Sequence, residues 1–132
     1  LHGRHQLNIE LHWRLFYNRH LLPLSMPEVS AAAGSQQVAG VEVAAMAWSD
    51  LMLYLCAHGA KHGWFRLFWL VDVDRLLQGC SDQQQQALLQ RAIELGAERM
   101  LLQALLLAHR LLATPVAPDL LRLAEQDAVV TK

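Results

Sequence analysis

One short stretch of the chain concentrates side chains that could hold an anion or move a proton. Residues 58–72 contain two imidazoles, an ammonium, a guanidinium and a carboxylate, from His58, Lys61, His62, Arg66 and Asp72. If the chain is helical up to residue 62, about 3.6 residues per turn place His58, Lys61 and His62 on one face. An ammonium beside two imidazoles raises the local positive potential. We therefore expect an anion there, with phosphate as the obvious candidate.

Other interpretations of these residues stay open. His58 and His62 have the i, i+4 spacing of a helical zinc pair, but Gly59 stands where a zinc-protease helix carries a glutamate, and no third ligand follows at a recognisable spacing. The two histidines could instead donate hydrogen bonds to backbone carbonyls between helices, and a single lysine could simply reach solvent.

Because glycine lowers helix propensity by about 1 kcal/mol relative to alanine, we interpret Gly59 and Gly63 as clearance for a neighbouring backbone or a ligand.

The same stretch also contains aromatic side chains. Large aromatic rings are more often part of a core than of a base-stacking platform, so we expect four of them in the core: Trp64, Phe65, Phe68 and Trp69. Asp72 and Asp74 could form ion pairs along the helix. Asp72 follows an apolar run on the half-buried side, and we rank it above Asp74 as a partner for Lys61 or Arg66.

A second polar group is predicted on a β-strand. Residues 7–15 alternate strictly between apolar and polar side chains, which is the period of a half-buried strand. Glu10 and His12 lie on its polar face. An isolated strand leaves its backbone groups unpaired, so this strand should belong to a sheet. Residues 38–43 offer only a weak second candidate, because Gly40 interrupts them.

The rest of the chain is predicted to be helical after a loop. Residues 21–40 combine prolines, alanines, glycines and glutamines, a composition that suits a loop. Ser49 and Asp50 resemble an N-cap, and Ser81 with Gln84 resembles a capping box. Four helices and a short fifth are expected, over residues 51 to 59 or 63, 64–77, 81–96, 97–113 and 118–127.

Composition limits the architecture. The 132 residues, 54% hydrophobic and 17% charged, suit one domain with a real core. The predicted fold class is α+β, with one or two N-terminal strands followed by a bundle of four to five helices. We divide the chain into residues 1–46, which hold the strand or strands and the loop, and residues 47–132, which form the helical part.

Charge and cysteine content restrict the partners. With a formal net charge of −1, the chain as a whole has no electrostatic attraction to nucleic acid or to a lipid surface. The apolar run 100–113 is too short to cross a hydrocarbon layer of about 30 Å, so no membrane partner is expected. Cys56 and Cys80 form neither a metal spacing nor a disulfide framework, which favours a reducing cytoplasm. A homodimer is a further possibility, through Leu101, Leu105 and Leu112.

Two blocks of sequence carry a resemblance to a known family. The first is Ile9-Glu-Leu-His-Trp-Arg-Leu15, and the second is His58-Gly-Ala-Lys-His-Gly-Trp-Phe-Arg-Leu-Phe-Trp-Leu-Val-Asp72. They resemble the signature blocks of the uncharacterised nucleotidyltransferases, a branch of the polymerase β-like nucleotidyltransferase superfamily. The similarity runs from about Asn8 to Leu112 and includes the helical segment 104–112.

The resemblance implies a function and a site. It implies transfer of a nucleotidyl group from an NTP to an unknown acceptor with Mg²⁺. In the superfamily, a paired acidic motif and a third carboxylate on a later strand hold two metal ions, and the resemblance places Glu10 at this third, catalytic carboxylate. It places Lys61 where relatives contact the nucleotide's phosphates, with His58 and His62 lining the same cleft. Three further residues would support the site: His12, Arg66 and Asp72.

One part of the superfamily pattern is missing. The Gly-Ser turn and the strand-borne Asp-x-Asp pair that normally precede the third carboxylate have no counterpart before Glu10. We therefore expect the chain to be the C-terminal part of such a protein and inactive alone, because one carboxylate cannot hold two Mg²⁺ ions. The alternative is a non-catalytic helical binding or interaction module with an anion pocket at His58, Lys61 and His62.

Overall fold

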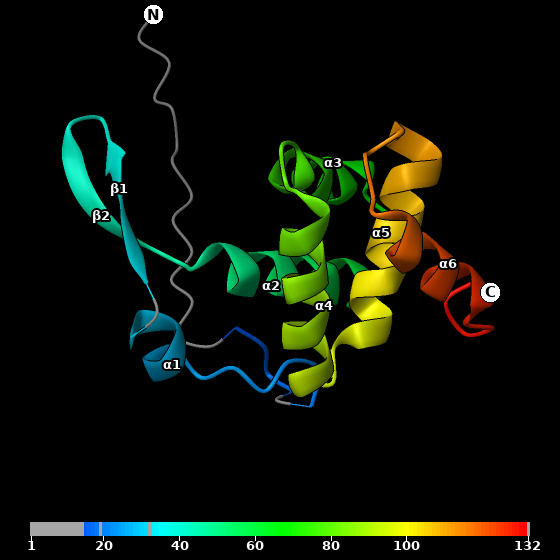
Figure 1. Ribbon diagram of the computed structural model, residues 1–132. Helices are drawn as coiled ribbons and strands as arrows, with labels where there is room; N and C mark the ends of the chain where they lie inside the picture. The colour runs from blue at the N-terminus through cyan, green and yellow to red at the C-terminus, as the bar shows by residue number, and fades with distance from the viewer. Residues whose placement is uncertain (1–14, 19, 32, 132) are drawn as a thin grey trace, which may run out of the picture.

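The computed structural model describes residues 15–18, 20–31 and 33–131, and it confirms the α+β class (Figure 1). A short helix and a two-stranded antiparallel hairpin precede a bundle of five helices. The elements are α1 (Met26–Ala31), β1 (Gly34–Val38), β2 (Val41–Ala45), α2 (Trp48–Lys61), α3 (Leu67–Leu77), α4 (Asp82–Glu94), α5 (Glu98–Leu112) and α6 (Pro118–Gln126).

The strand predicted over residues 7–15 lies outside the described residues, except for its last position. Glu10 and His12 are therefore not placed by the structure. The candidate site is built below from the helical part of the chain alone.

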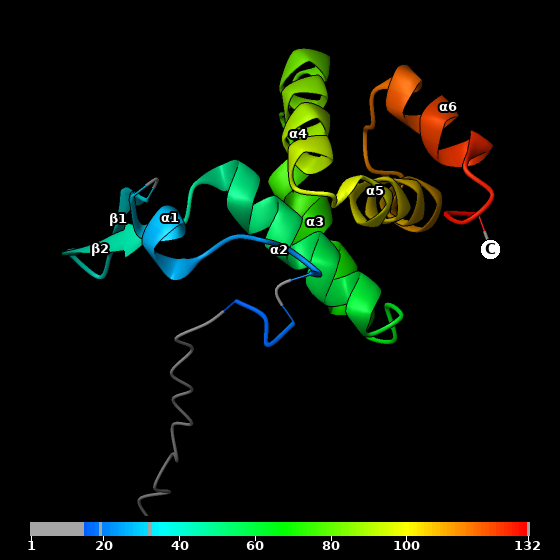
Figure 2. The same ribbon diagram turned by 90° about the horizontal axis from the view of Figure 1, so that it is seen from below.

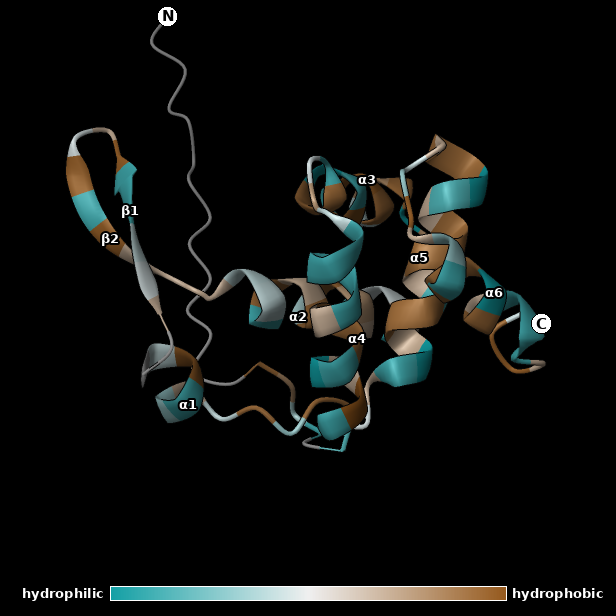
Figure 3. Cartoon of the chain, viewed as in Figure 1, coloured by the Kyte–Doolittle hydropathy of each residue, from teal (hydrophilic) through white to brown (hydrophobic). Residues whose placement is uncertain are grey.

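Helix α5 is the centre of the bundle. It packs against α2, α3, α4 and α6, and Figure 2 looks almost along its axis, with α6 on one side and the other helices on the opposite side. Apolar residues recur along its length (Figure 3), and Leu101 and Leu105 have no exposed surface. Because these two side chains fill the core of their own chain, the predicted dimer contact cannot use them. Leu112, at the end of α5, is half-buried.

The β1–β2 hairpin projects away from the helices (Figure 1). Val38 pairs with Val41, so Ala39 and Gly40 form a two-residue turn, with φ values of 50° and 81°. Two positive φ values are typical of the type I′ turn, whose twist matches that of the strands it joins. Gly40 therefore makes the turn between two strands, and the prediction of one interrupted strand over residues 38–43 is wrong.

The segment 21–40, predicted as a loop, contains α1 and β1. Helix α1 begins with a capping box, in which the Ser25 N–H donates to Glu28 Oε2 at 2.7 Å and the Glu28 N–H donates to Ser25 Oγ at 3.4 Å. Pro27 occupies an early helical position, where its missing N–H has no cost. The loop prediction is wrong because this Ser-x-x-Glu signal outweighs the local proline and alanine content.

The helix ends mostly follow their predicted caps. Ser81 and Gln84 form the predicted capping box, with both reciprocal bonds present at the start of α4. Helix α6 begins at Pro118, also as predicted. Helix α2 instead begins at Trp48, before the predicted cap, and Asp50 is a buried residue whose Oδ1 lies 3.6 Å from Arg91 Nε of α4.

Buried polar side chains join α3 and α4 to the α5–α6 connection. Gln85 Oε1 accepts the backbone N–H of Ala117 at 2.9 Å, and Gln85 Nε2 donates to the Pro115 carbonyl at 3.3 Å. Thr114 Oγ1 donates to Asp74 Oδ1 at 2.6 Å. Such bonds satisfy groups that would otherwise be desolvated at a cost, and no periodic pattern in the sequence predicts them.

A sharp corner joins α2 to α3. The Gly63 N–H donates to the Ala60 carbonyl at 3.0 Å and the Trp64 N–H to the Gly59 carbonyl at 2.9 Å, which is the Schellman pattern. Gly63 and Trp64 have φ values of 59° and 53°. Both residues leave the helical conformation, so α3 begins at Leu67 and the prediction of a helix from Trp64 is wrong by three residues.

The Trp64 indole packs back onto α2 over Gly59. A Cβ added to Gly59 would lie 2.3–2.5 Å from three indole carbons, which is closer than van der Waals contact permits. Trp64 Nε1 donates to Gln103 Oε1 of α5 at 3.0 Å. The clearance predicted at Gly59 therefore serves a side chain of the same chain, and not a neighbouring backbone or a ligand.

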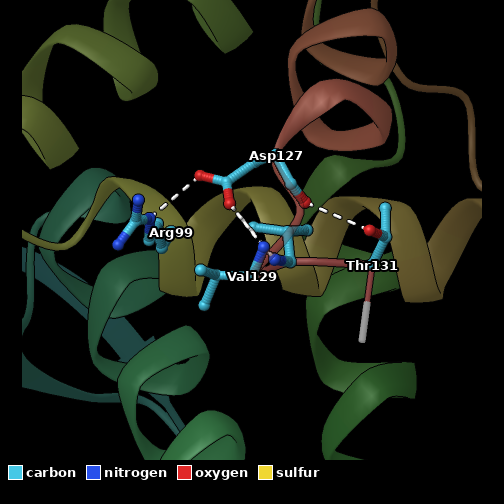
Figure 4. A network of polar contacts seen from close by, with 5 residues as sticks. Arg99, Asp127, Val129 and Thr131 are labelled. Atoms are coloured by element: carbon cyan, nitrogen blue, oxygen red, sulfur yellow. Dashed lines mark hydrogen bonds and ion pairs between the residues drawn. The ribbon is translucent and has the colours of Figure 1, made fainter.

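After α6 the chain returns to α5 through Asp127 (Figure 4). Asp127 Oδ1 accepts the Val129 N–H at 2.8 Å, Asp127 Oδ2 accepts Arg99 Nε at 2.9 Å, and the Asp127 carbonyl accepts Thr131 Oγ1 at 3.2 Å. The Val129 N–H, followed by the Arg99 guanidinium, holds the pKa of Asp127 below its usual value. This carboxylate fastens the C-terminal segment to the bundle.

Replacing Gly59 by alanine tests the corner. Helix propensity alone favours alanine by about 1 kcal/mol, but the added Cβ would displace the indole. We expect Gly59→Ala to lower the free energy of unfolding by about 1–3 kcal/mol, measured by urea denaturation. Gly34→Ala is the matched control, because Cβ at that position meets nothing within 4 Å. A Gly59→Ala protein as stable as the wild type would contradict the described packing.

The pH dependence of stability tests the Asp127 network. A carboxylate whose pKa is lower in the folded than in the unfolded state stabilises the fold above its ordinary pKa, and this contribution is lost as the pH falls through the folded-state value. Asp127→Asn should therefore lower the melting temperature at pH 7, with the difference from wild type shrinking as the pH falls below about 4. Glu42→Gln, in the exposed hairpin, is the control for the removal of a carboxylate that lies outside this network. A constant difference for Asp127→Asn would refute the assignment.

Candidate functional site

The residues predicted to bind an anion lie at the corner between α2 and α3, at the end of α2 that points away from the hairpin (Figure 2). Lys61 is the last residue of α2, and His62 is its C-cap. The ring centroids of His58 and His62 are 4.8 Å apart. The Trp69 ring of α3 lies 4.9 Å from His58 and 5.4 Å from His62. The structure thus places two imidazoles and an indole together.

Lys61 and Arg66 are exposed cations at this corner. The Arg66 guanidinium carbon lies 5.4 Å from the centre of the Phe65 ring and 6.0 Å from that of Trp69. In the described part of the chain, neither cation forms an ion pair. The arginines of α4, α5 and α6 all pair with carboxylates: Arg91, Arg99, Arg110 and Arg122. Arg75, at the other end of α3, is also exposed and forms no ion pair among the described residues. Positive charge at the corner is therefore not neutralised by the described side chains.

Asp72 does not have the predicted partners. Within the ranges that the structure describes, its carboxylate pairs with neither Lys61 nor Arg66. Asp74 is the better-connected carboxylate, because its Oδ1 accepts Thr114 Oγ1 at 2.6 Å and Gln78 Nε2 at 3.0 Å. Residues two positions apart on a helix point to different sides, and Asp74 is the one that faces the α5–α6 connection. Neither aspartate forms an ion pair with Lys61 or Arg66 among the described residues, so the predicted order of Asp72 and Asp74 as partners of these cations stays a prediction.

The aromatic residues divide into an inner and an outer group. Trp64 packs against the core and Trp69 is half-buried, whereas Phe65 is 67% exposed and Phe68 is 54% exposed. The prediction that all four rings belong to the core is wrong for the two phenylalanines, because Trp64 takes the inward position over Gly59. Phe65 and Trp69 meet edge to face, with ring centroids 5.0 Å apart.

The described residues do not build a metal centre. No three His, Cys, Asp or Glu side chains in this part of the chain gather closely enough to hold an ion. The His58–His62 pair therefore has no third ligand there for zinc. Asp72-Val73-Asp74 has the letters of an Asp-x-Asp motif but lies within α3, where its two carboxylates diverge. This helical pair does not fit the two-metal site of the superfamily.

Neither cysteine suits nucleophilic chemistry. Burial raises the pKa of Cys56 to about 12. Burial also raises the pKa of Cys80, whose Sγ donates to the Leu76 carbonyl at 3.2 Å. Because the thiolate is the reactive form, these thiols are not activated as nucleophiles. The groups available for chemistry at the corner are therefore its cations and its aromatic and imidazole rings.

A hollow of about 340 Å³ borders the same corner on the side of α5. Its polar lining includes Gln103 and Arg110, both of which already have partners. Gln103 Oε1 accepts Trp64 Nε1, and Arg110 Nη2 lies 3.6 Å from Glu125 Oε1. An anion is therefore expected to bind at the exposed Lys61 and Arg66, and not in this hollow, whose polar groups are already paired.

Comparison with known proteins agrees with the two sequence blocks. The model of a family described as "Uncharacterised nucleotidyltransferase" matches residues 2–113, which include both blocks and the corner. No curated protein and no solved structure matches the chain. Among the described helices, none has the length and apolar character needed to span a membrane. Because the match covers most of its length, the chain belongs to the uncharacterised nucleotidyltransferase family.

Proposed function

We propose that the α2–α3 corner binds the phosphates of a nucleoside triphosphate during nucleotidyl transfer. The observation that carries this proposal is the presence of two exposed cations, Lys61 and Arg66, without carboxylate partners among the described residues. The family membership supports the reaction class. His58 and His62, whose ring centroids are 4.8 Å apart, contribute two further nitrogen-bearing rings at the same corner.

The proposed reaction is an attack of an acceptor hydroxyl or amine on the α-phosphorus of the NTP. The new bond to phosphorus forms as the bond to the bridging oxygen breaks, pyrophosphate leaves with that electron pair, and the proton of the acceptor hydroxyl or amine passes to solvent. The Lys61 ammonium would stabilise negative charge on the phosphate oxygens as a point charge, and the Arg66 guanidinium could bind two oxygens at once. Donors held in place before the reaction stabilise such charge with little reorganisation.

Mg²⁺ is proposed to accompany the nucleotide, with Glu10 as the metal ligand that this chain supplies and His12 and Asp72 in support. When bound, the metal would neutralise the phosphate charge. The described residues add no carboxylate cluster, so we assign no step to the metal. We propose that the chain alone does not catalyse transfer, because Mg²⁺ needs several oxygen ligands.

The second candidate is a non-catalytic module that binds an anion at the same corner. The lack of an acidic cluster in the part of the chain that the structure describes favours it. Release of pyrophosphate from ATP and Mg²⁺ by this chain would exclude the non-catalytic module, whereas no release is expected of both candidates, because neither assigns transfer to the chain alone. The two free cysteines suit a reducing cytoplasm for either function.

Removing the lysine charge tests the proposal. Charge-assisted hydrogen bonds are worth about 1.5–3 kcal/mol, so Lys61→Ala should weaken ATP binding about tenfold to a hundredfold in isothermal titration calorimetry with Mg²⁺ present. The matched control is Arg75→Ala, which removes an exposed cation from the far end of α3.

The control should bind ATP as the wild type does, apart from a small effect that salt removes. Equal ATP affinities for the wild type and Lys61→Ala would show that Lys61 does not contact the nucleotide. Equal losses in both variants would indicate non-specific attraction to positive charge.

A further inference from the structure

The corner exposes aromatic surface directly beside its unneutralised cations. Phe65 is 67% exposed, Leu67 57% and Phe68 54%. Burying one such side chain is worth about 1.5–3 kcal/mol. A ligand that covers these three side chains would therefore gain a large hydrophobic contribution to its binding free energy. The phenylalanines also flank Arg66 in the sequence, which places charge within the apolar patch.

The rings form a connected group, and not isolated side chains. Phe65 contacts Trp69 edge to face at 5.0 Å, and its ring centroid lies 6.2 Å from that of His62. Phe68 lies 5.8 Å from the same indole. Because the half-buried Trp69 anchors both phenylalanines, their positions are held before any ligand arrives. A platform fixed in advance costs less entropy when a ligand binds.

We propose that Phe65 and Phe68 form the platform on which the base of the bound nucleotide stacks. This inference rests on the proposed function, because it assigns the base-binding part of the same site. The surface combines exposed aromatic rings with the cations Lys61 and Arg66, and a nucleotide combines an aromatic base with negative charge. An aliphatic lipid chain or an apolar peptide would satisfy the rings but leave the cations without partners.

Stacking of this kind makes few demands on the identity of the base. Every base has a π face, and stacking on aromatic side chains tolerates changes of base. The described corner shows no arrangement of buried polar groups that would read a base edge. Purine and pyrimidine triphosphates should therefore bind with similar affinity, with a modest preference for the larger purine ring.

Binding of ATP and of inorganic tripolyphosphate to the same set of variants tests the inference. Phe65→Leu keeps an apolar side chain but removes the ring, and it should weaken ATP binding about fivefold to a hundredfold while leaving tripolyphosphate binding unchanged. Phe65→Tyr keeps the ring and should bind both ligands as the wild type does. Lys61→Ala should weaken binding of both ligands. Circular dichroism checks that each variant is folded.

The outcomes separate the inference from the proposal on which it rests. If Phe65→Leu and Phe68→Leu both bind ATP normally while Lys61→Ala weakens both ligands, the stacking platform is overturned and phosphate binding stands. If Lys61→Ala changes neither affinity, or the wild type binds neither ligand, the proposed function fails together with the inference. Should Phe65→Leu not fold, Phe68→Leu decides in the same assay.

Discussion

The packing of the Trp64 indole against Gly59 determines the shape of the α2–α3 corner. A side chain larger than hydrogen at position 59 would occupy the place of the ring, and the bond from Trp64 Nε1 to Gln103 fastens the corner to the central helix α5. With Trp64 facing inwards, Phe65 and Arg66 remain outside. The corner thus depends on one glycine and one tryptophan, neither of which would touch a ligand.

Charge is distributed unevenly over this framework. Arginines on α4, α5 and α6 lie beside carboxylates that neutralise them, as on ordinary protein surfaces. The corner instead combines Lys61 and Arg66 with two imidazoles and exposed rings, and neither cation forms an ion pair with a described carboxylate. An electrostatic attraction of this kind is local, because the net charge of the whole chain is only −1. The proposed ligand, a nucleotide, is the class of molecule that satisfies both the charge and the rings.

Much of the fold could be predicted from local signals in the sequence. The Ser81–Gln84 box and Pro118 gave correct helix starts, because capping depends on residues close in sequence. The i, i+4 spacing also indicated that His58 and His62 would lie together. The orientation of Phe65 could not be predicted, because it depends on the positive φ of Trp64 and on contacts with α5. The Asp74–Thr114 bond spans 40 positions, and no local pattern reveals it.

The most direct test of the account is to observe the histidine rings by NMR while ATP is added. His58 and His62 lie at the corner, whereas His109 is on α5 with its Nδ1 3.0 Å from the Thr114 carbonyl, so it is an internal reference. If ATP binds at the corner, the ring signals of His58 and His62 will shift with a saturable dependence on ATP concentration, while those of His109 will not move. Shifts of all three rings together, or of none, would contradict a nucleotide site at the corner.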